Sequence, residues 1–172
     1  MNVSVRILGR AALTFAGYFA TVAASLAFSH AVWPEGLAHN AQFMFWPASG
    51  VALLFALRFG PAYAPAILLA VIPAVGLAGE PFMRAVLGAT GNLLETWTAW
   101  FVLVRLARFE ERIDSTRAVA GLTAATMLGG AVASLSYPLL TGLSGGFEAT
   151  TWDSTLIRYT FANSTGSLIV VA

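Results

Sequence analysis

The sequence predicts an all-α protein, a polytopic transmembrane bundle of about six helices. Hydrophobic residues make up 58% of the 172 positions and charged residues only 10%, whereas soluble domains carry about 25% charged residues. Lipid disfavours charges, so this composition suits a chain that lies in a bilayer. The apolar runs are continuous rather than alternating, which favours helices over the strands of a barrel.

Six apolar stretches have lengths near the twenty or so residues that a helix needs to cross a bilayer. They cover roughly 9–33, 42–58, 62–78, 85–107, 117–142 and 155–172. We therefore expect residues 1–172 to form a single integral-membrane domain. The first stretch is too long for a signal peptide and is not followed by a cleavage site and soluble sequence, so we interpret it as a retained span.

Helix-breaking residues separate the stretches. Pro34-Glu35-Gly36 ends the first, Gly60-Pro61 makes a turn after the second, and Gly79 to Pro81 follows the third. A charged run, RLARFEERIDSTR, occupies 105–117, and a Gly/Ser/Thr-rich loop occupies 142–153. Proline and glycine clusters are typical of turns where the backbone reaches water.

The arginines predict the orientation. With the N-terminus in the cytoplasm, seven of the nine basic residues lie inside, and only Arg84 and Arg158 lie outside. Loops on the cytoplasmic side are enriched in basic residues. We therefore predict a multi-pass protein of the bacterial inner (cytoplasmic) membrane with a cytoplasmic N-terminus.

Several functional classes are excluded or disfavoured. The absence of cysteine excludes disulfides and thiolate metal sites, and a net charge of +1 provides no field for nucleic acid. The motifs GxGxxG, GxxxxGK[ST], HExxH and GxSxG are absent in their required contexts. The two histidines, His30 and His39, lack a second ligand at metal spacing. We predict no enzyme activity, no metal and no cofactor.

The fourth stretch carries a carboxylate that should face the bundle interior. Asn92 and Glu95 are three residues apart and so share a helix face. A carboxylate in hydrocarbon is costly and needs a partner. Two interpretations remain open: a site for ligand, proton or signal coupling, and an interhelical hydrogen bond for which Gly88 and Gly91 allow close packing.

Polar or small residues also mark the second and last stretches. Trp46 suits an interface, Pro47 suits a first helical turn, and Ser49 suits a close helix contact. Arg158 could pair with Glu95 or Asp153, although snorkelling toward the interface is favoured, and Asn163 is typical of residues that join helices. The candidates for ligand binding or helix coupling are thus Asn92, Glu95, Trp46, Ser49, Asn163 and Arg158.

These motifs together resemble the first class of membrane-associated sensor domain, the MASE type. The family's Trp-Pro-Pro-Ala/Ser-Gly motif matches FWPASG, and its Gly-Asn-x-x-Glu-Ala motif matches GNLLET. The matching residues are Trp46, Pro47, Ser49, Gly50, Gly91, Asn92 and Glu95. The family's later Trp-Trp-x-Gly-Asp-x-x-Gly helix corresponds to 159–166, where Asn163 replaces the Asp and Tyr159 and Thr160 replace the two Trp. The resemblance covers roughly 43–172.

The resemblance implies a sensory input module of bacterial signalling proteins. Such domains usually continue for two more helices and an output domain, a histidine kinase or a diguanylate cyclase. The last apolar run ends without a polar cap, so we expect either a short final helix or a natural protein that continues past Ala172.

Two other functions are considered. One is an accessory subunit of a larger membrane complex, such as a photosynthetic or respiratory assembly, with lipid or pigment contacts. A small transporter is disfavoured because inverted repeats are absent. Under either leading interpretation the partners are the lipid bilayer and other membrane helices, in a homo- or hetero-oligomer.

Overall fold

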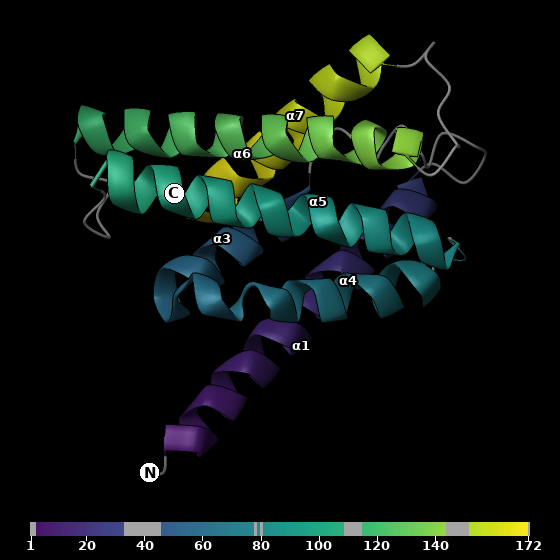
Figure 1. The fold of residues 1–172 in the computed structure, drawn as a ribbon, viewed down its shortest axis with the longest axis horizontal. Coiled ribbons are helices and arrows are strands. Elements are labelled where there is room, and N and C mark those ends of the chain that lie inside the picture. The colour runs from purple at the N-terminus through teal and green to yellow at the C-terminus, as the bar shows by residue number, and fades with distance from the viewer. Residues whose placement is uncertain are drawn as a thin grey trace.

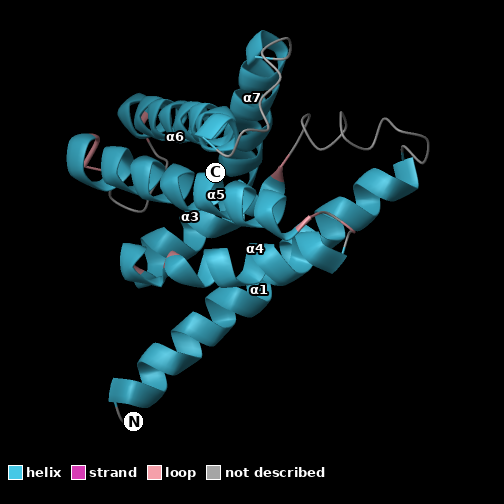
Figure 2. Cartoon of the chain, turned by 45° about the vertical axis from the view of Figure 1, so that its right-hand side comes forward, coloured by secondary structure: helices cyan, strands magenta, loops and turns pink. Residues whose placement is uncertain are grey.

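The computed structural model describes the backbone of residues 3–32, 46–77, 79, 81–108, 115–143 and 152–171. In this part of the chain the regular structure is entirely helical (Figure 2), which confirms the predicted all-α fold class. The helices are α1 (Val3–Val32), α3 (Pro47–Phe59), η1 (Pro61–Tyr63), α4 (Pro65–Leu77), α5 (Phe82–Phe101), η2 (Val102–Leu106), α6 (Thr116–Leu143) and α7 (Trp152–Val171).

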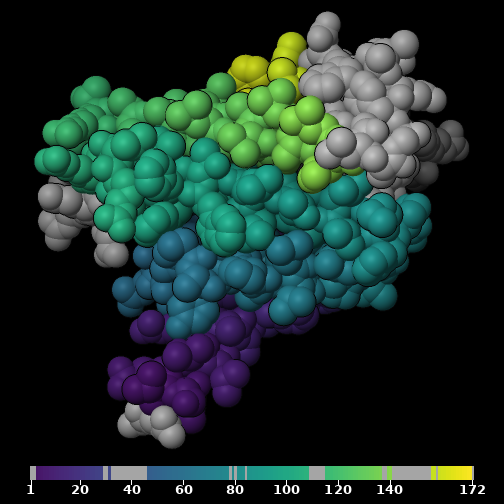
Figure 3. Space-filling view, viewed as in Figure 1, coloured from purple at the N-terminus to yellow at the C-terminus, as the bar shows by residue number. Residues whose placement is uncertain are grey.

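The six α-helices of the described residues pack as a ring of neighbours. In the order α1, α4, α5, α6, α7 and α3, each helix contacts the next, α3 returns to α1, and α3 also contacts α5 across the ring. Figure 1 shows α5 and α6 side by side, with α4 along the other edge of α5. The first part of α1 projects from the body of the molecule (Figure 3).

Within the described ranges, two helices have the length and apolar composition to cross a membrane, over Val3–Phe28 and Thr116–Ser136. Helices α3 and α4 have 13 residues each and are each about 20 Å long, shorter than a hydrocarbon core of about 30 Å. The break between them lies at Gly60, whose φ of 95° ends α3. Pro61–Leu77 then forms one apolar helical stretch. Part of the expected span 42–58 lies outside the described residues.

Helix α5 does not end as an ordinary α-helix. It continues into η2, a π-helical turn in which the Ala107 N–H donates to the Val102 carbonyl oxygen at 2.9 Å. Arg108 then has a φ of 52°, in the left-handed region that ordinary residues rarely adopt. The helix therefore stops at the start of the charged run expected at 105–117, of which 109–114 lie outside the described residues.

The interior of the bundle is lined by small side chains and the outside by large apolar ones. Buried alanines recur on α3, α4, α5 and α6, while Leu8, Leu69 and Ile169 are 69%, 65% and 64% exposed. Exposed large apolar side chains occur on all six of these α-helices, and large exposed apolar surfaces are uncommon on soluble proteins. Such a surface is expected of helices that contact lipid.

Candidate functional site

Three helices bring polar side chains together at one carboxyl group. Glu95 of α5 is 3% exposed, and its Oε2 accepts a hydrogen bond from Ser49 Oγ of α3 and another from Asn163 Nδ2 of α7, each at 3.0 Å. Ser49 and Asn163 are themselves 3% and 5% exposed. We refer to Ser49, Glu95 and Asn163 as the polar centre. Its two hydrogen bonds link α5 to α3 and α5 to α7.

The start of α3 is fixed against α7 by the backbone. The Trp46 N–H donates to the Ala162 carbonyl oxygen at 3.2 Å, and the Ser49 N–H donates to the Trp46 carbonyl oxygen at the same distance. Pro47 occupies the first turn, where its missing N–H costs little. This arrangement delivers the Ser49 hydroxyl to the bundle interior one turn into the helix.

Glycines allow α3 and α7 to approach closely at this point. A Cβ on Gly166 would overlap the backbone of Trp46, and a Cβ on Gly50 would lie 2.6 Å from the Gly166 carbonyl oxygen. Small residues at helix contacts in membranes permit such approach of two backbones. The geometry of the polar centre therefore depends on Gly50 and Gly166, which place Ser49 and Asn163 within reach of the same oxygen.

A second glycine pair places α6 between α5 and α7. A Cβ on Gly129 would lie 2.9 Å from the Glu95 carbonyl oxygen, and one on Gly130 would lie 2.9 Å from the Thr160 carbonyl oxygen. On the same side, Thr160 Oγ1 donates to Ser134 Oγ at 3.0 Å. These contacts were not anticipated from the sequence, although adjacent glycines within an apolar helix indicate a packing role.

Two buried polar atoms near the polar centre have no hydrogen-bond partner among the described residues. They are Glu95 Oε1 and the hydroxyl of Tyr18 on α1. Tyr18 is fully buried and belongs to the same core cluster as Ala48 and Leu93, against which Trp46 packs. An unpaired buried polar group costs free energy comparable to a lost hydrogen bond. The sequence interpretation missed Tyr18 because an aromatic residue in an apolar span is usually interfacial or core.

The other candidate residues are not members of the polar centre, or have side chains outside the described residues. Asn92 is only half-buried, and its amide donates to the Gly88 carbonyl oxygen of its own helix at 3.0 Å. Trp46 is half-buried and packs against the core cluster. Arg158 lies within α7, but its side chain is outside the described residues. The structure thus brings Ser49, Glu95 and Asn163 together and leaves Asn92 on a neighbouring face.

Gly88 and Gly91, the two glycines that precede Glu95 on α5, differ in how closely other helices approach them. A Cβ on Gly91 would lie 3.2 Å from Ser136 Oγ, so Gly91 does serve a close contact with α6. A Cβ on Gly88 would meet nothing within 4 Å. The expectation that Gly88 allows close packing is therefore wrong: Gly88 is only half-buried and lies four residues from Asn92, on the same partly exposed side of α5.

The chemistry available at the polar centre is hydrogen bonding. One carboxyl oxygen accepts two bonds, and the other oxygen is free to accept a further one. In the described residues no group of three or more His, Asp or Glu side chains is placed to hold a metal ion. The arrangement can fix the register of three helices, and it can respond to anything that competes for the Glu95 carboxyl group.

The helical fold, its lipid-suited surface and its buried polar centre define a polytopic helical membrane domain. A family comparison matches the MASE1 model over residues 9–172. The chain therefore belongs to the MASE1 family of membrane-associated sensor domains, as its motifs predicted. Neither the curated proteins nor the solved structures contain a match to this chain.

Membership of the MASE1 family establishes the general function of the chain. The chain is an integral, multi-pass membrane domain in contact with the lipid bilayer, and it serves as a non-catalytic sensory input module of bacterial signalling proteins. Nothing in the match supports the alternative of an accessory subunit of a photosynthetic or respiratory complex.

Proposed function

We propose that the polar centre couples the signal received by this MASE1 domain to the positions of α3 and α7 relative to α5. The observation that carries the proposal is the convergence of two donors, from two different helices, on the single oxygen Glu95 Oε2. A relative displacement of about 1 Å would lengthen either bond beyond hydrogen-bonding distance. The centre therefore favours one arrangement of the three helices over others.

A sensor needs a second arrangement that the signal favours by differential affinity. The unpaired Glu95 Oε1 gives a signal a point of action, because a new donor there can draw the carboxyl group away from the positions of Ser49 and Asn163, which both bond Oε2. The movement then reaches the end of α5 through η2, which carries Arg105. π-helical turns are frequent at functional sites.

We also propose that the N-terminus and η2 lie on the cytoplasmic side. This orientation rests on the arginine asymmetry, in which seven of the nine basic residues lie on the side of the N-terminus, and on the positive-inside rule. It places the end of α5 where a signalling partner of the cytoplasm can respond to it. The exposed apolar faces remain available to other membrane helices, in homo- or hetero-oligomers.

Distance measurements between spin labels test the coupling. The chain contains no cysteine, so a Leu54→Cys/Leu106→Cys pair can be labelled selectively. Both positions are exposed, at 45% and 64%, and they report the position of α3 relative to the end of α5. In the labelled pair we expect Glu95→Leu to shift or broaden the distance distribution, because neither Ser49 nor Asn163 retains its acceptor.

Matched variants make the measurement specific. Glu95→Gln keeps a side-chain carbonyl oxygen that can accept both bonds, so it should preserve the parental distribution. Thr123→Leu, at an exposed position of α6, controls for a change in apolar surface. An unchanged distribution in the Glu95→Leu variant would show that the polar centre does not set the position of α3.

A further inference from the structure

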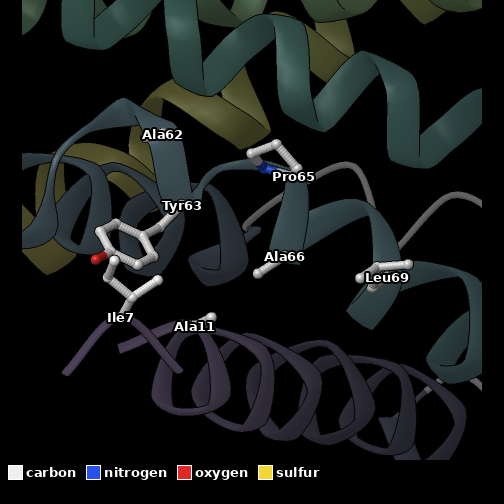
Figure 4. A pocket seen from close by; sticks show the side chains of 7 residues that line it. All are labelled: Ile7, Ala11, Ala62, Tyr63, Pro65, Ala66 and Leu69. Atoms are coloured by element: carbon white, nitrogen blue, oxygen red, sulfur yellow. The ribbon is translucent and has the colours of Figure 1, made fainter. Parts of the chain in front are cut away.

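An apolar groove lies between α1 on one side and η1 and α4 on the other, away from the polar centre. Its volume is about 400 Å³, within the range of about 300–1,000 Å³ usual for small-molecule sites. Figure 4 shows Ile7 and Ala11 of α1 on one wall, and Tyr63, Ala66 and Leu69 on the other. The groove exists because the alanines leave space between the two helices.

One end of the groove connects to Arg10 through two aromatic rings. The guanidinium carbon of Arg10 lies 5.6 Å from the centroid of the Phe59 ring, a cation–π arrangement. Phe59 in turn packs edge-on against Tyr63, with ring centroids 6.1 Å apart. Tyr63 lines the groove. Phe59 and Tyr63 therefore link the Arg10 guanidinium group to the apolar wall of the groove.

Two more arginines lie close in sequence to the residues of this contact. Arg6 lies one turn before Arg10 on α1, and Arg58 precedes Phe59 in the last turn of α3. All three side chains are exposed. Helices α1, α3, η1 and α4 contain no Asp or Glu, so their own side chains leave this positive charge unneutralised.

We propose that this groove is a binding site for an anionic glycerophospholipid. One acyl chain would lie along Ile7, Ala66 and Leu69, and the phosphate would lie among the guanidinium groups of Arg6, Arg10 and Arg58. Guanidinium groups match phosphate oxygens with paired donors, and basic pockets between membrane helices bind anionic headgroups. In the proposed orientation the lipid belongs to the cytoplasmic leaflet.

The positive charge of the three arginines favours an anionic lipid over a second copy of the chain as the occupant of the groove. In a symmetric dimer the same patch on both subunits would face itself. That contact would bring the arginines of one copy against those of the other. An anionic headgroup instead neutralises them, while its acyl chain fills the apolar part of the same site.

Native mass spectrometry of the full chain in detergent tests the proposal. The probes are palmitoyl-oleoyl phosphatidylglycerol and phosphatidylcholine, which share acyl chains and differ in net charge. We expect tighter binding of phosphatidylglycerol, and a loss of about fivefold in its affinity for Arg10→Gln, from about one kcal/mol per basic residue near an anionic surface. Ala66→Phe should reduce binding of both lipids by filling the groove.

Control variants separate a site from general charge and general hydrophobicity. Arg117→Gln removes an exposed arginine at the start of α6, and Ala124→Phe adds a ring at an exposed position of the same helix; neither should change binding. If Ala66→Phe does not fold, Ala62→Phe at the exposed edge of the groove replaces it. Equal binding of the two lipids, equal effects of Arg10→Gln and Arg117→Gln, or a groove-filling variant without effect would each overturn the proposal.

Discussion

The hydrogen bond between Asn163 and Glu95 should stabilise the bundle measurably. Asn163→Leu keeps the approximate volume of the side chain but removes one of the two donors to Glu95 Oε2, which are both 3.0 Å away. Hydrogen bonds between membrane helices contribute about 0.6 kcal/mol on average and up to about 1.7. Both partners here are at least 95% buried, so we expect a value in the upper part of that range or slightly above it.

A double-mutant cycle isolates this bond from the other effects of substitution. Glu95→Leu and Asn163→Leu are measured singly and together, by reversible unfolding in mixed micelles with tryptophan fluorescence as the readout. Each single variant leaves either Glu95 or Asn163 buried without its partner. The double variant contains neither polar group, so this penalty is absent from it. We expect a coupling free energy of about 1–2 kcal/mol, a factor of about 5–30 in the unfolding equilibrium.

The matched control pairs Asn92→Leu with Asn163→Leu. The Asn92 amide donates to its own helix at Gly88, so these two substitutions should be additive within about 0.5 kcal/mol. If the effects of Glu95→Leu and Asn163→Leu add equally well, the bond between α5 and α7 contributes nothing specific. The reasoning that gives the polar centre a role would then be refuted.

Two further substitutions test the packing around the centre. Gly166→Ala places a Cβ against the Trp46 backbone and should lower the free energy of unfolding. Gly88→Ala meets open space and should raise it through helix propensity, by up to about 1 kcal/mol. Changes of the same sign in the unfolding assay would contradict the close contact at Gly166. Trp97→Phe removes the 3.0 Å bond from the indole N–H to the Pro61 carbonyl oxygen. Because this bond is exposed, a loss of less than about 1 kcal/mol is expected, and a larger loss would show that α5 and η1 depend on it.

The fold class followed from composition because lipid imposes a simple constraint. Backbone polar groups in a bilayer must be paired within the protein, and continuous apolar runs satisfy this only as helices. The family followed from the motifs at Trp46 and Gly91. Helix ends were less predictable: η1 and the π-helical turn η2 depend on local packing at Pro61 and Val102, which no periodicity describes.

The composition of the polar centre could not be derived from spacing. Ser49 and Asn163 lie 46 and 68 residues from Glu95 in the sequence, and only tertiary packing aligns them. The sequence spacing suggested Asn92 as the polar neighbour of Glu95, but side chains three positions apart on a helix differ by about 60° in direction. That rotation turns Asn92 toward the partly exposed side of α5 while Glu95 faces inward.

The polar centre is better understood as a source of specificity than of stability. The contacts at Gly50, Gly166, Gly129 and Gly130 allow the helix backbones to approach closely, and van der Waals packing is less directional than a hydrogen bond. The directional hydrogen bonds to Glu95 add to this packing a preference for one register, a role known for buried polar groups in other helical assemblies. Two bonds of about 1–2 kcal/mol each fall short of the roughly 5.5 kcal/mol that a full reversal of a two-state equilibrium requires. A signal acting at Glu95 therefore needs a contribution from elsewhere, and α3, which carries Ser49 at its start and Arg58 at its end, joins the polar centre to the groove proposed for lipid.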